Sequence, residues 1–187
     1  MRVINWRQFL KDGLPLGEKP ASITIGVFDG VHLGHHALIN RIVSYNADAG
    51  YVPVIFTFRQ NHKTENKEQC DIQSFDERLA VFERLRVQIT VVIDFTEEFR
   101  QMPGREFLQI LSEHCNIGFF AVGSDFRCGY RLDTDAVAIV EFFSSQNIPV
   151  EIVPLVCEGQ FPVSSSRIRA AMADGDIERA QTMLGKM

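Results

Sequence analysis

The chain has 187 residues, of which 45% are hydrophobic and 23% charged, and its formal net charge is −5. This composition fits one globular domain, and the acidic balance without a Lys/Arg run argues against a nucleic-acid-binding protein. No stretch approaches the ~18 consecutive apolar residues of a membrane helix. The four cysteines form no CxxC pair, and the first residues do not resemble a secretion signal. We therefore expect free thiols and a cytoplasmic location.

Predicted strands and helices alternate from the first apolar run onward. The run 21–28 predicts a buried strand that ends at an Asp-Gly turn, and apolar residues at helical spacing predict a helix over 33–49. A second strand is expected at 51–58, followed by a polar, irregular segment over 59–74. Ser74 and Glu77 form a capping-box pattern, which predicts a helix to about residue 86.

The second half of the chain continues this alternation. Strands are predicted at 88–95, 117–122 and 150–154, and helices at 104–115, 133–146, 164–173 and 176–184. The pattern predicts an α/β domain over 1–187, with a doubly wound, mainly parallel five-stranded sheet and helices on both faces. In such sheets ligands bind beyond the carboxyl ends of the strands, where the strand order reverses.

The segment GVFDGVHLGH joins the first predicted strand to the first predicted helix. Gly26, Gly30 and Gly34 allow a ligand to approach the backbone, because no Cβ stands in the way. The helix start directs free N–H groups at that ligand. His32 and His35 lie on neighbouring helical positions, where their imidazoles can donate hydrogen bonds to a phosphoryl group.

Two other interpretations of this segment are open. One is a plain strand-to-helix turn whose histidines are solvated or cap the helix, since isolated glycine-rich turns are weak evidence of function. The other is a zinc site built from His32, His35 and His36, although an acidic or thiol ligand at a suitable spacing is not evident.

A second phosphate-binding pattern lies in the segment VSSSRIR. Ser164, Ser165 and Ser166 precede a predicted helix, and serines are strong N-cap residues whose hydroxyl and N–H groups can bind phosphate. Arg169 lies one turn further on, where its guanidinium can bind two phosphate oxygens and stabilise departing pyrophosphate. The alternative is an ordinary capped helix with solvated arginines at 167 and 169.

A third segment, GSDFRCG, follows the fourth predicted strand and combines a carboxylate, an aromatic ring and a cation with two glycines. Such a loop can hold a base or the edge of a flavin. The alternative is a plain turn with a solvated Asp-Arg pair, which is the commoner case.

These segments together resemble one known family. GVFDGVHLGH is similar to the N-terminal FMN adenylyltransferase domain of bacterial bifunctional riboflavin kinase/FAD synthetases, which carry the HxGH signature of the nucleotidyltransferase superfamily. SSSRIR resembles the superfamily's ISSTxxR-like motif, GSDFRCG the family's G-x-D/N-F-x-F-G segment, and TFRQNH its TFxPHP-like string. The resemblance implies a Rossmann-like nucleotidyltransferase fold.

The resemblance also implies roles for individual residues. Catalytic phosphate contacts are implied for His32, His35, Ser165 and Arg169. Nucleotide or flavin binding is implied for Gly26, Phe28, Asp29, Gly30, Gly34, Thr57, Phe58, Asn61, Asp125, Phe126 and Ser164. The sequence departs from the family pattern in two segments: Cys128 replaces an aromatic residue, and in TFRQNH both prolines are absent and Asn61 stands where a histidine is expected.

The implied reaction transfers AMP from ATP to FMN, giving FAD and pyrophosphate, with Mg²⁺ bridging the phosphates. In the family the kinase module follows the C-terminal helices, and because this chain ends at residue 187 we expect no riboflavin kinase domain. Two alternatives are open: another transferase of the superfamily, of the pantetheine-phosphate adenylyltransferase or cytidylyltransferase type, and a non-catalytic flavin- or nucleotide-binding module.

Overall fold

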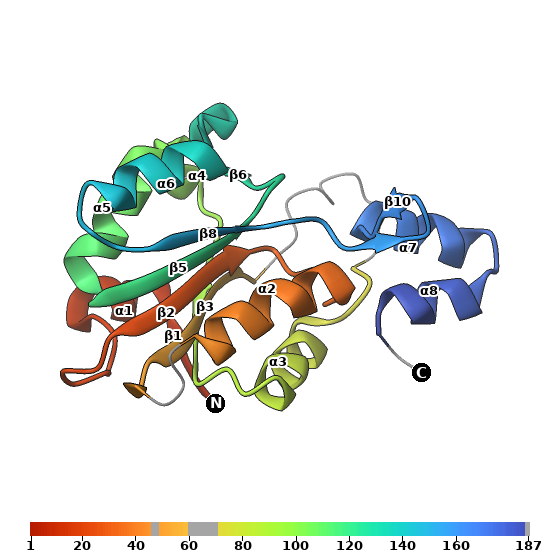
Figure 1. Cartoon of the computed structure of the whole chain (residues 1–187), viewed down its shortest axis with the longest axis horizontal. Coiled ribbons are helices and arrows are strands. Elements are labelled where there is room, and N and C mark those ends of the chain that lie inside the picture. The colour runs from red at the N-terminus through yellow and green to blue at the C-terminus, as the bar shows by residue number, and fades with distance from the viewer. Residues whose placement is uncertain (46–48, 60–70, 186–187) are drawn as a thin grey trace.

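The computed structural model describes residues 1–45, 49–59 and 71–185. Its centre is a sheet of six parallel strands in the order β1-β4-β3-β2-β5-β8 (Figure 1). The strands are β1 (Arg2–Asn5), β2 (Ala21–Gly26), β3 (Val52–Phe58), β4 (Ile89–Ile93), β5 (Ile117–Gly123) and β8 (Val150–Val153). The chain moves from β2 through β3 to β4 and then returns to β5 on the other side of β2. The strand order therefore reverses between β2 and β5.

Helices cover both faces of this sheet. They are α1 (Trp6–Asp12), α2 (Leu33–Ser44), α3 (Phe75–Arg84), α4 (Glu97–Gln101), α5 (Gly104–His114), α6 (Ala136–Ser144), α7 (Ser165–Ala173) and α8 (Ile177–Met183). Buried side chains of α2 and α3 pack on one face, whereas those of α1, α5 and α6 form a larger apolar cluster on the other. The expected parallel α/β architecture with two covered faces is confirmed.

The expected number of strands was wrong, because the sequence prediction missed β1 and the helix α1 that follows it. Strand β1 pairs with β4 at the edge of the sheet, and only Ile4 of its four residues is buried. Such a short strand shows too little apolar alternation to be recognised locally. Helix α2 also ends earlier than predicted, at Ser44, while the polar segment predicted at 59–74 lies largely outside the described residues.

Two short hairpins and a helical pair complete the fold. Strands β6 (Arg127–Cys128) and β7 (Thr134–Asp135) flank the 3-10 turn Tyr130–Leu132, and β9 (Cys157–Glu158) pairs with β10 (Phe161–Pro162). Helices α7 and α8 lie beyond the carboxyl ends of the strands (Figure 1) and have a small apolar core of their own. This arrangement brings the start of α7 toward the point where the strand order reverses.

No helix in the described part of the chain is long and apolar enough to cross a membrane. Cys115, Cys128 and Cys157 are free thiols, as predicted, and Cys70 lies outside the described residues.

Candidate active site

A cavity of about 330 Å³ opens at the carboxyl ends of β2 and β5, between the sheet and the start of α7. It brings together three segments that are far apart in the sequence. The predicted site residues that line it are Gly26, Phe28, Asp29, His32, Gly34, His35, Asp125, Phe126, Ser164, Ser165 and Arg169. The position agrees with the rule that ligands of open α/β sheets bind where the strand order reverses.

Three predicted site residues do not line the cavity, and a fourth lies outside the described residues. Thr57 is fully buried, and its hydroxyl donates a hydrogen bond to the Val27 carbonyl at 3.3 Å. Phe58 packs in an aromatic cluster with Phe95 and Phe99. Gly30 forms the turn itself, with a φ of 58°, and Asn61 lies outside the described residues.

His32 and His35 cap the start of α2 reciprocally. The backbone N–H of His35 donates to Nδ1 of His32 at 3.3 Å, and the backbone N–H of His32 donates to Nδ1 of His35 at 3.4 Å. The two rings stack with their centroids 3.6 Å apart. Because each Nδ1 is an acceptor, a neutral ring in this arrangement carries its proton on Nε2, which becomes a hydrogen-bond donor.

Burial keeps this histidine pair neutral. It lowers the pKa of His32 to about 4, and nearby His36 acts in the same direction, while Asp125 and Asp29 oppose the change. Burial also holds the pKa of His35 well below its usual value, with His32 and His36 contributing. Near pH 7 the cavity therefore presents two uncharged imidazoles, which can stabilise developing phosphate charge by donating hydrogen bonds.

The glycines of this turn fit against aromatic rings of the same segment. A Cβ added to Gly26 would lie 3.1 Å from the ring of Phe28, and one added to Gly34 would lie 3.1 Å from the ring of His32. Phe28 itself adopts a left-handed backbone, with a φ of 54°, and its buried ring contacts those of His35 and Phe82. The small residues thus permit the strained, close-packed turn that places the histidines.

Asp29 connects this turn to two other segments. Its carboxylate forms an ion pair with Arg169 of α7 and accepts a hydrogen bond from the Ile72 N–H at 3.0 Å. Its backbone carbonyl accepts the hydroxyl hydrogen bond of Ser165 at 2.9 Å. The side chain of Asp29 is buried, so these contacts form in a partly desolvated environment where charge pairs are strong. Asp29 therefore fixes the start of α7 and its arginine against the histidine turn.

The serines at the start of α7 line the cavity. Ser164 is the N-cap, and its hydroxyl oxygen accepts from the N–H of Arg167. The hydroxyl of Ser165 donates its hydrogen bond to the backbone carbonyl of Asp29. Ser166, which belongs to the predicted serine run but received no role from the family resemblance, also lines the cavity. The first-turn N–H groups of a helix are its natural anion-binding groups.

The GSDFRCG segment supplies another part of the cavity wall. Gly123, Asp125, Phe126 and Arg127 line it, together with residues 153–156 at the end of β8 and just beyond it, which the sequence interpretation did not assign. Arg127 pairs across the β6–β7 hairpin with Asp135, at 4.0 Å.

Arg78 of α3 was also missed, although it supports the site from within the protein. Its side chain is 1% exposed, and its guanidinium donates to the carbonyls of Val27 at 2.7 Å, Phe58 at 3.2 Å and Arg59 at 2.9 Å. These carbonyls lie at the carboxyl ends of β2 and β3. Burial lowers the pKa of Arg78, opposed by Asp71 and Asp29. Its helical position on a buried face was the one available sequence signal.

The family model described as FAD synthetase matches residues 15–167. The chain belongs to the FAD synthetase family. This match confirms the family expected from GVFDGVHLGH and SSSRIR.

The chain is similar to two bacterial proteins named bifunctional riboflavin kinase/FMN adenylyltransferase. That of Buchnera aphidicola subsp. Schizaphis graminum is 28% identical over 174 residues, which are 89% of this chain and 55% of the relative. That of Escherichia coli K12 is 27% identical over 168 residues, which are 87% of this chain and 53% of the relative. The chain therefore spans about half the length of these curated relatives.

The fold of this FAD synthetase family member also occurs in a crystal structure of a protein described as a macrolide-efflux protein from Streptococcus pneumoniae. The two structures align with a TM-score of 0.84 and 25% sequence identity, over the whole of this chain and 60% of the other.

Proposed function

We propose that this protein is an FMN adenylyltransferase, which transfers the AMP group of ATP to FMN and releases pyrophosphate. One observation carries the proposal: the imidazoles of His32 and His35, the start of α7 and Arg169 converge on one cavity. That cavity lies in a chain of the FAD synthetase family. Two uncharged donors, a helix N-terminus and a guanidinium together form a strong site for a polyphosphate.

The proposed reaction needs no covalent enzyme intermediate. An oxygen of the FMN phosphate attacks the α-phosphorus of ATP, and the bond from that phosphorus to the bridging oxygen of the β-phosphate breaks. The electron pair leaves with pyrophosphate. Because a phosphate is already ionised near pH 7, no general base is required. The protein contributes alignment of the two substrates and stabilisation of the charge on the leaving group.

The residues divide this work between them. His32 and His35 donate through their neutral imidazoles to the phosphate oxygens, while the N–H groups at the start of α7 bind the departing phosphates. Arg169 is held by Asp29 beside the cavity and supplies a permanent positive charge. We assign the second substrate to the side of the cavity formed by Asp125 and Phe126.

Magnesium is proposed to enter with ATP. Among the residues that the structure describes, no group of three or more His, Cys, Asp or Glu side chains is placed to hold a metal ion. Mg²⁺ commonly keeps several waters and binds largely through substrate phosphates. When bound in this way, it neutralises part of the triphosphate charge.

Direct product analysis tests the proposal. The protein is incubated with ATP, Mg²⁺ and FMN, and FAD and pyrophosphate are measured together by chromatography and a coupled assay. Equal amounts of FAD and pyrophosphate are expected. Pyrophosphate release with pantetheine phosphate or another phosphate ester, but not with FMN, would instead show a different transferase. Nucleotide binding without pyrophosphate would show a non-catalytic module.

A further inference from the structure

The hairpin formed by β9 and β10 joins the sheet to α7, and the residues that flank it on both sides line the cavity. Its base is closed by a hydrogen bond from the Val163 N–H to the Val156 carbonyl, at 2.8 Å. Both valines line the cavity, and Val163 leads directly into the serines at the start of α7. The direction in which those serines present their N–H groups therefore depends on how the hairpin is held.

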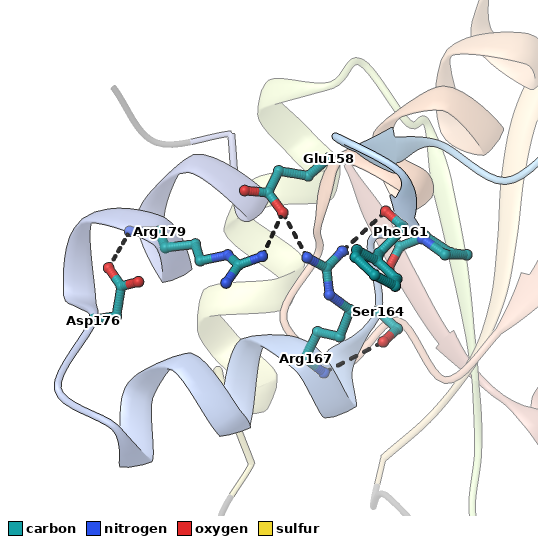
Figure 2. A network of polar contacts seen from close by, with 7 residues as sticks. Glu158, Phe161, Ser164, Arg167, Asp176 and Arg179 are labelled. Atoms are coloured by element: carbon teal, nitrogen blue, oxygen red, sulfur yellow. Dashed lines mark hydrogen bonds and ion pairs between the residues drawn. The ribbon is translucent and has the colours of Figure 1, made fainter.

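Arg167 holds this hairpin against α7. Its Nη1 donates to the carbonyls of Phe161 at 2.9 Å and Pro162 at 2.8 Å, and its Nη2 donates to Glu158 at 2.5 Å. The guanidinium also lies over the ring of Phe161, 5.6 Å from its centroid. Figure 2 shows these contacts together with the cap from the Arg167 N–H to Ser164. The side chain of Arg167 thus holds the backbone of Phe161 and Pro162, which lie shortly before the start of α7.

Arg179 of α8 approaches the same carboxylate oxygen of Glu158, at 3.0 Å (Figure 2). Hydrogen bonds from Arg179 and Arg167 lower the pKa of Glu158, which therefore stays ionised near neutral pH. The two arginines differ in one respect. Both bind Glu158, but among the described residues only the guanidinium of Arg167 also donates to the two carbonyls of β10.

We propose that Arg167 is a positioning residue for the nucleotide, acting through the hairpin and the start of α7. This inference rests on the proposed function, because it assumes that the start of α7 binds ATP phosphates. The guanidinium of Arg167 pairs with Glu158, whereas that of Arg169 is assigned to the phosphates. Arg167 therefore contributes to nucleotide binding by holding the start of α7 in position. Small displacements of binding groups are costly where N–H groups must point at a phosphate.

The test compares Arg167→Met with Arg179→Met, which both remove one ion pair to Glu158. The dissociation constant of a non-hydrolysable ATP analogue is measured by calorimetry, the KM values for ATP and FMN by FAD formation, and folding by thermal unfolding. Arg167→Met is expected to raise the analogue dissociation constant and the KM for ATP roughly tenfold, the scale of a lost charged hydrogen bond. The KM for FMN should stay within about twofold of its wild-type value, since we assign FMN to Asp125 and Phe126, which belong to a different segment of the cavity wall. Arg179→Met should leave all three constants near wild type.

Arg167→Lys keeps a cationic donor but loses the planar guanidinium that binds several acceptors at once, so it should recover part of the ATP affinity. It also provides a second measurement if Arg167→Met folds poorly. Equal effects of Arg167→Met and Arg179→Met on ATP affinity, or equal rises in the KM for ATP and FMN, would overturn the inference. Failure of the wild-type protein to form FAD would count against the proposed function alone, because the analogue dissociation constants still decide the role of Arg167.

Discussion

The Nδ1 atoms of His32 and His35 each accept a hydrogen bond from the other residue's backbone N–H, so the two histidines are at once a helix cap and part of the cavity wall. The cap interpretation and the ligand interpretation of this motif are therefore compatible. Capping uses Nδ1 and leaves Nε2 as the donor of a neutral ring.

Replacing His32 should separate its two roles. His32→Ser keeps a capping oxygen but removes the imidazole, so we expect a loss of about 10²–10³ in kcat with nearly unchanged stability. His32→Ala should lose the same activity and, in addition, about 1 kcal/mol in the free energy of unfolding because the cap is gone. Steady-state FAD formation and urea unfolding check both effects. Near-wild-type kcat in both variants would contradict the role of the imidazole.

The low pKa of His32 predicts how stability depends on pH. The folded pKa of about 4 lies below the ordinary value of 6.5, so between these values the unfolded chain binds a proton that the folded chain does not. The contribution of His32 is therefore complete above about pH 6.5 and is lost as the pH falls toward 4. Urea unfolding at pH 5, 6 and 7 should show a smaller loss of stability in His32→Ser than in wild type. Parallel losses in the two proteins would contradict this prediction.

The ion pair between Asp29 and Arg169 should contribute to both stability and ATP binding. We expect Asp29→Asn, which keeps an acceptor for Ile72, to lower the free energy of unfolding by about 1–3 kcal/mol, because a charged hydrogen bond to a buried carboxylate is weakened. In a double-mutant cycle with Arg169→Met, the two losses should be non-additive by about 1 kcal/mol, since the residues are in contact. Fully additive losses would show that the pair is not coupled.

Arg78 should be essential for the stability of the turn beneath the cavity. Arg78→Met removes the hydrogen bonds that the guanidinium donates to the carbonyls of Phe58 and Arg59. We therefore expect the free energy of unfolding at pH 7 to fall by about 2–4 kcal/mol. The carbonyl of Val27 keeps the hydroxyl of Thr57 as a donor.

The matched control is Arg84→Met, which changes an exposed arginine of the same helix and should alter stability by less than about 0.5 kcal/mol. Urea unfolding of both variants checks the difference. Equal stability of Arg78→Met and Arg84→Met would contradict the assigned hydrogen bonds.

The strands and helices with local signals could be predicted from the amino-acid sequence alone. Apolar runs predicted the strands β2, β3, β4, β5 and β8, and the Ser74–Glu77 capping box predicted the start of α3. These signals are local because strand burial and helix capping depend on residues close in the chain. The same local signals placed the histidine turn and the serine-led helix start at strand and helix ends, which was enough to predict that both face one ligand.

The contacts between groups that are distant in the sequence became visible in the folded chain and not before. The pairing of β1 with β4, the ion pair of Asp29 with Arg169, and the burial of Arg78 against three carbonyls join residues far apart in the sequence, where no local pattern specifies a partner. Thr57 and Phe58 likewise fitted a motif, but the topology directs them into the interior beside the cavity. The order of the strands in the sheet decides which side chains come into contact, and that order is set by long-range packing.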